Sequence, residues 1–133
     1  MTPSPGKLVP RLIAALIFIS AGVLHFVTPA PFVHIVPPSL PAPEALVAVS
    51  GFFEILGGVG ILVPRLRRAA GWGLIALLIA VYPANIHMLV NDVYLPGAPE
   101  VRWTLWARMP LQFVAAWLVW RGAGLQWRDF TGN

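Results

Sequence analysis

The chain has 133 residues, of which 58% are hydrophobic and 11% are charged, and its mean hydropathy is +0.77. A soluble domain carries about 25% charged residues, so this composition excludes an ordinary soluble protein and predicts an integral membrane protein. The formal net charge is +4, and the chain contains no cysteine, which excludes disulfides, thiolate catalysis, iron–sulfur clusters and covalent haem attachment.

The length allows four membrane-spanning helices of about 20 residues each, joined by short connections. The first apolar run covers residues 10–27 and has Lys7 and Arg11 at its start, so we expect an uncleaved signal anchor. Residues 28–43 are rich in proline, which removes backbone donors and fixes φ. We therefore expect no regular helix in this segment, but an apolar loop packed against the outer mouth of the helices.

Glu54 lies inside the second apolar run, which covers residues 44–63. It is about ten residues from the start of the run, hence about 15 Å deep and close to the midplane of the bilayer. A charge at this depth costs roughly 2.5–3.5 kcal/mol on insertion scales, so the carboxylate needs a partner or a pocket. Small residues on the same helical face predict a close helix–helix seam, and they are Ser50, Gly57 and Gly58.

The third apolar run covers residues 69–90 and contains Pro83, which is expected to bend the helix. The fourth run covers residues 103–120 and carries Arg108 and Gln112 one helical turn apart. Tryptophans at both ends of this run are typical of the two membrane interfaces; they are Trp103, Trp106, Trp117 and Trp120.

The basic residues are distributed unevenly between the connections. Seven of the nine Lys and Arg residues lie near the N-terminus, in the connection 64–68 and in the C-terminal tail. Arg102 lies on the opposite side and Arg108 lies within a span. The positive-inside rule therefore predicts a multi-pass protein of the cell inner (plasma) membrane with both termini cytoplasmic. Because the basic residues flank apolar runs, we expect the lipid bilayer, and not nucleic acid, as the partner.

Polar side chains of the spans gather in their outer halves. We expect them to line one ligand-binding pocket, with the segment 28–43 as its lid; they are His25, Glu54, Tyr82, Asn85, His87, Arg108 and Gln112. Arg108 is the expected counter-charge of Glu54, directly or through Gln112 or water, because pairing offsets the insertion cost of both. The alternative is structural: the charged pair only fixes helix register, and the histidines cap helix ends.

The chain resembles the DoxX-like family of small four-span membrane proteins over roughly residues 10–120. The matching segments are residues 21–26 followed by Pro29 and Phe32, then 51–58, 83–88 and 108–112. The resemblance implies an all-α fold, an integral membrane four-helix bundle forming a single transmembrane domain over residues 1–133. It also implies an association with membrane oxidoreductases, since the family takes its name from a subunit of a thiosulfate:quinone oxidoreductase. Other relatives of this superfamily look like membrane chaperones or cargo receptors.

Two function classes follow. The first is a redox-associated subunit, at most one subunit of a membrane oxidoreductase, that binds quinone or a similar hydrophobic small molecule. Its catalytic residues stay open, with Glu54 as a candidate proton relay beside donors that could meet a quinone carbonyl. The second is a chaperone, assembly or cargo-binding protein without chemistry, acting with other membrane or periplasmic subunits or as a homo-oligomer. No metal-ligand spacing is present, and a b-type haem between His25 and His87 is disfavoured.

Overall fold

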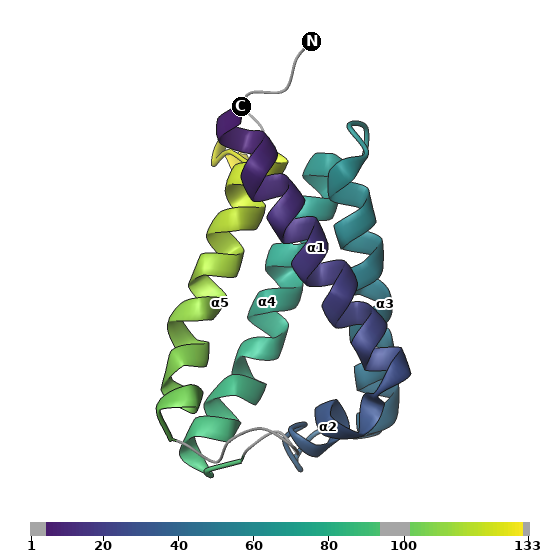
Figure 1. Cartoon of the computed structure of the whole chain (residues 1–133), viewed down its shortest axis with the longest axis vertical. Helices are drawn as coiled ribbons and strands as arrows, with labels where there is room; N and C mark the ends of the chain where they lie inside the picture. The colour runs from purple at the N-terminus through teal and green to yellow at the C-terminus, as the bar shows by residue number, and fades with distance from the viewer. Residues whose placement is uncertain (1–4, 94–101, 132–133) are drawn as a thin grey trace.

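The computed structural model describes residues 5–93 and 102–131. All regular secondary structure in these two ranges is helical, as the sequence predicts (Figure 1). The helices are α1 (Pro5–Val27), α2 (Pro29–His34), α3 (Pro43–Leu62), α4 (Arg67–Val90), α5 (Arg102–Ala123) and α6 (Arg128–Thr131).

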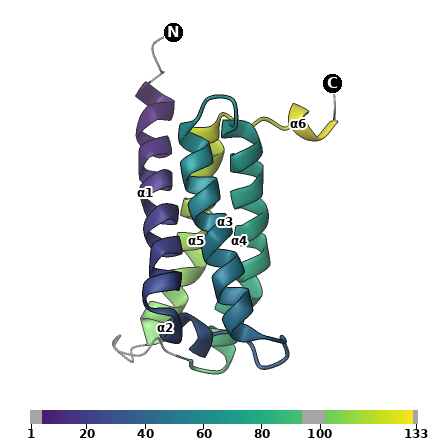
Figure 2. The same cartoon turned by 90° about the vertical axis from the view of Figure 1, so that its right-hand side faces the viewer.

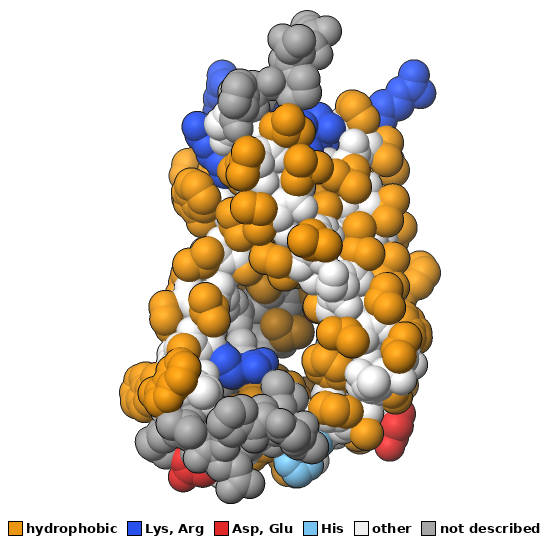
Figure 3. Space-filling model, viewed as in Figure 1, with side chains coloured by type: hydrophobic (Ala, Val, Ile, Leu, Met, Phe, Trp, Pro, Cys, Tyr) orange, Lys and Arg blue, Asp and Glu red, His pale blue; other side chains and the backbone are white. Residues whose placement is uncertain are grey.

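Three of the described helices are long and apolar enough to cross a membrane, namely α1 from Gly6 to Val27, α3 and α4. This supports the predicted membrane association. Helix α5 has 22 residues, enough to span a bilayer, but carries Arg102, Arg108 and Arg121 and does not reach the same hydropathy. Large hydrophobic side chains face outward along the helices, which suits contact with lipid (Figure 3).

The four long helices contact one another in a ring, in the order α1, α3, α4, α5 and back to α1. The start of α1, the connection between α3 and α4 and the end of α5 lie at the same end of the molecule (Figures 1 and 2). We call this the basic end, because it carries Lys7, Arg11, Arg65, Arg67, Arg68, Arg121 and Arg128. Helix α2 packs on α1 and α3 at the other end, which we call the α2 end.

Arginine side chains bind backbone carbonyls that the helices leave unpaired at the basic end. Arg67 Nε donates to the Ile61 carbonyl at the end of α3, with an N–O distance of 2.9 Å, and Arg11 Nε donates to the Gly122 carbonyl in α5 at 2.8 Å. Arg121 Nε donates to the Gly6 carbonyl at 3.1 Å. This carbonyl has no intrahelical partner, because the residue four positions later is Pro10, which lacks an N–H. The bonds of Arg11 and Arg121 tie α1 to α5, and the bond of Arg121 stabilises the first turn of α1, which begins at Pro5, five residues earlier than predicted.

Residues 29–34 correct the expectation that the proline-rich segment contains no regular helix, because they form α2. Pro29 and Pro31 lie in its first turn, where a backbone N–H has no intrahelical partner, so proline costs no hydrogen bond. The prediction of an irregular connection holds beyond Ile35, where the remaining prolines interrupt helical structure until Pro43.

Two apolar clusters form the interior. The larger lies toward the basic end and consists of Ala14, Ala15, Phe18, Ile61, Leu74, Val119, Ala123 and Leu125. The smaller lies at the α2 end and joins Ile35, Met88 and Leu105 from three different parts of the chain. The polar residues that the sequence places in the spans lie along the helices between these two clusters.

Candidate functional site

Glycines let α1 and α3 approach closely. A Cβ on Gly22 would lie 2.6 Å from the Gly51 carbonyl oxygen, and a Cβ on Gly51 would lie 2.7 Å from the His25 Cβ. A Cβ on Gly58 would lie 3.3 Å from the Ala15 carbonyl oxygen. We call Gly22, Gly51 and Gly58 the glycine seam. The sequence predicted the seam at Ser50, Gly57 and Gly58. Gly58 does face α1, whereas Gly57 packs against Leu74 of α4.

The seam brings His25 of α1 against Glu54 of α3. His25 Nδ1 lies 2.7 Å from Glu54 Oε2, and the two side chains are 11% and 12% exposed. Both atoms are buried, and neither has another partner among the described residues. A nitrogen and an oxygen this close share a proton. The edge of Phe32 from α2 covers the imidazole, with ring centroids 4.1 Å apart.

The prediction that Arg108 pairs directly with Glu54 is wrong. The reason is the order of the helices: α3 neighbours α1 and α4, whereas α5 lies across the ring. Glu54 therefore meets His25, and Arg108 Nε donates to Asn85 Oδ1 of α4 at 3.3 Å. Gln112 does not bridge the two charges in the described contacts, since it bonds Asn85 and the Leu78 carbonyl.

A second polar network joins α4 to α5, and we call it the α4/α5 polar chain. Arg108 can only donate, so Asn85 presents its oxygen to the guanidinium and its Nδ2 to Gln112 Oε1, at 2.5 Å. Gln112 Nε2 then donates to the Leu78 carbonyl, also at 2.5 Å. The direction of every bond in this chain is thus fixed by the guanidinium at one end and the carbonyl at the other.

Tyr82 and His87 join neither network through a described contact. The Tyr82 ring packs against Phe113 of α5, with ring centroids 6.1 Å apart. His87 Nδ1 lies 3.0 Å from Asn91 Nδ2, which also donates to the His87 carbonyl at the end of α4. His87 thus has the helix-end environment that the structural alternative predicts. In the described residues no group of three or more His, Asp or Glu side chains is placed to hold a metal ion.

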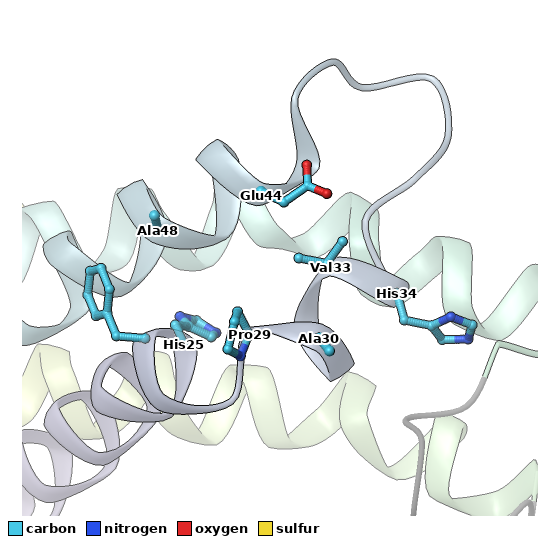
Figure 4. Close-up of a pocket in the computed structure, with 8 residues that line it drawn as sticks. His25, Pro29, Ala30, Val33, His34, Glu44 and Ala48 are labelled. Carbon is cyan, nitrogen blue, oxygen red and sulfur yellow. The ribbon is translucent and has the colours of Figure 1, made fainter.

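An open groove of about 660 Å³ lies beside His25, between the end of α1, α2 and the start of α3 (Figure 4). Its lining is His25, Phe26, Pro29, Ala30, Val33, His34, Glu44 and Ala48. Figure 4 shows Glu44 and His25 on separate parts of the wall, with the His34 ring directed away from the other labelled side chains. Sequence reasoning missed Glu44; the available signal was the Pro43-Glu44 pair, which is typical of the first turn of a helix.

Gln112→Leu tests the α4/α5 polar chain. The substitution keeps the volume but leaves Asn85 Nδ2 and the Leu78 carbonyl without their partner. Polar contacts between membrane helices contribute about 0.6 kcal/mol on average and up to about 1.7, so we expect a loss of roughly 1 kcal/mol in the free energy of unfolding. Unfolding in detergent measures it, and adding Asn85→Leu to the variant should cost less than Asn85→Leu costs in the wild type. Full additivity would show that the two amides do not interact.

No curated protein and no solved structure matches the chain at a significant level. A family model described as "Domain of unknown function (DUF8561)" matches residues 14–123, from the middle of α1 to the last residue of α5. The matched range contains the glycine seam, the His25–Glu54 pair and the whole α4/α5 polar chain. The chain therefore belongs to the DUF8561 family, a family of unknown function.

Proposed function

We propose that this protein is a four-span protein of the inner membrane with both termini cytoplasmic, and that its fold is a DoxX-like four-helix bundle. Support comes from three helices that are apolar enough to span and from a fourth, α5, that completes their ring. The orientation is supported by the basic end, since Lys and Arg favour the cytoplasmic side. The outer half of the bundle then contains the α2 end, the groove and both polar networks.

We propose further that the groove binds a quinone or a similar hydrophobic small molecule, as a redox-associated subunit would. The observation that carries this proposal is the position of His25, which lines the groove and contacts Glu54 at 2.7 Å. A mostly apolar wall with a few polar groups is the usual composition of a small-molecule site. In the ion-paired form both ring nitrogens carry protons, so Nε2–H is left to donate to a carbonyl oxygen.

Glu54 has the role of a proton relay in this proposal. Reduction of a quinone to a quinol takes up two electrons and two protons. The His25–Glu54 pair supplies a buried place for a proton next to the groove. The electrons would come from a partner subunit.

Titration of the detergent-purified protein with decylubiquinone, followed by tryptophan fluorescence, tests this proposal. We expect His25→Ala and Glu54→Gln to weaken binding about tenfold or more, which corresponds to the loss of one charge-assisted hydrogen bond. His87→Ala is the matched control and is expected to leave the affinity unchanged, because His87 contacts Asn91 and not the groove. Unchanged affinity in both His25→Ala and Glu54→Gln would falsify the quinone proposal.

The second candidate function is a chaperone, assembly or cargo-binding protein. It is favoured by the shape of the groove, which is open and formed by three separate elements, so that it could also receive an apolar segment of a client. Native mass spectrometry distinguishes the candidates. A stoichiometric protein partner without a bound small molecule supports the second candidate, whereas a co-purified quinone supports the first.

A further inference from the structure

We infer that the α4/α5 polar chain is a second binding site, in which Arg108 takes an anionic phosphate or carboxylate group. The site is separate from the groove, and the inference does not rest on quinone binding. Three observations carry it: the direction of the hydrogen bonds, the positions of the acidic side chains and the hollow between α1 and α5.

The hydrogen bonds of the α4/α5 polar chain use only one of the guanidinium nitrogens. Arg108 Nε donates to Asn85, and Asn85 Nδ2 donates to Gln112. Gln112 Nε2 in turn donates to the Leu78 carbonyl. None of the hydrogen bonds in this network involves the two Nη groups of Arg108. The amide network therefore holds the guanidinium in position without neutralising it.

The described acidic side chains do not neutralise Arg108 either. Glu54 is paired with His25 on the other side of the ring, and Asp129 is paired with Arg68 at the basic end. No ion pair joins Arg108 to a carboxylate within residues 5–93 and 102–131. A half-buried cation in a span costs several kcal/mol unless it finds an anion or water, so an anionic ligand would offset part of this cost.

The bundle is open on the side between α1 and α5. These helices are tied together at the basic end by Arg11 and Arg121, and they diverge toward the α2 end (Figure 1). The space-filling view shows a hollow between them, with hydrophobic side chains around it and a basic side chain at its lower edge (Figure 3). The hollow opens toward the side of the bundle, where lipid would lie.

Arg108 belongs to α5, one of the two helices that border the hollow, and a guanidinium is suited to hold an anion there. Its planar fork binds phosphate or carboxylate oxygens through two parallel hydrogen bonds. Arg108 is six residues from the start of α5, about 9 Å along the helix, within reach of a head group from the outer surface. The apolar rim would meet a hydrocarbon tail. The ligand class is therefore an anionic amphiphile, and a free anion is the alternative source of the same chemistry.

Native mass spectrometry of the full chain in neutral detergent tests the site with three matched probes. Hexadecyl phosphate has both the charge and the tail, hexadecanol has only the tail, and inorganic phosphate has only the charge. We expect one hexadecyl phosphate per chain, bound at least tenfold more tightly than hexadecanol. Competition by inorganic phosphate at equal concentration would assign the site to free anions, and lack of competition would assign it to amphiphiles.

Variants locate the binding. Arg108→Gln is expected to reduce the affinity for hexadecyl phosphate to that for hexadecanol, and Arg108→Lys, which keeps the charge but loses the fork, to weaken it several-fold. Arg65→Gln, which removes an exposed arginine at the basic end, is the control and should change the affinity less than twofold. Unchanged binding in Arg108→Gln would overturn the inference.

Discussion

Replacing Gly22 with alanine is expected to lower the free energy of unfolding by about 1–3 kcal/mol, the usual cost of overpacking a close contact. The new Cβ would lie 2.6 Å from the Gly51 carbonyl oxygen and 3.1 Å from the Ile55 backbone nitrogen. Both atoms belong to the backbone of α3, so they cannot move without separating α1 from α3. The same separation would pull His25 away from Glu54, because both residues lie next to the seam.

Gly73→Ala is the matched control for this experiment. Gly73 is an exposed glycine within α4, and a Cβ there would meet no atom within 4 Å. Alanine is favoured over glycine in a helix by about 1 kcal/mol, so this variant is expected to be as stable as the wild type or more stable. Unfolding of both variants in mixed micelles gives the comparison. If the two substitutions had the same effect, the seam would not depend on close backbone contact.

The helices could be predicted well because their signals are local. Each span is an apolar run bounded by proline or basic residues, and α3 and α4 begin and end within about two residues of the prediction. Helix α2 was missed, because prolines in a first turn look the same in a sequence as prolines that break a helix. The first turn of α1 is also stabilised by a distant residue, since Arg121 binds the carbonyl that Pro10 leaves unpaired.

The site shows where a single sequence stops being sufficient. The depth of Glu54 follows from its place in an apolar run, and so does its need for a partner. The identity of that partner depends on which helices are neighbours, and spacing along the chain does not contain that information. Arg108 was the predicted partner because it carries a full charge within a span. Because α1 is a neighbour of α3 in the ring and α5 is not, the partner of Glu54 is His25.

His25→Leu is expected to have the largest effect on stability of the substitutions considered. It leaves the carboxylate of Glu54 buried without its partner, which typically costs about 3–5 kcal/mol. Glu54→Leu should also be destabilising, because it leaves the buried His25 imidazole without its partner. The double variant His25→Leu/Glu54→Leu replaces the pair with apolar side chains and is expected to recover much of the loss. Unfolding free energies of the four proteins give the coupling directly.

A parallel cycle with Glu54→Leu and Arg108→Gln separates the two possible partners of Glu54. Arg108 contacts Asn85 on the other side of the ring, so the effects of these two substitutions are expected to add within about 0.5 kcal/mol. Glu54→Leu is common to both cycles, so any general damage it causes cancels in the comparison. Coupling with Arg108 and none with His25 would restore the pair expected from the sequence. Coupling with His25 alone would leave Arg108 without an acidic partner among the described residues, which is the condition that anion binding at Arg108 requires.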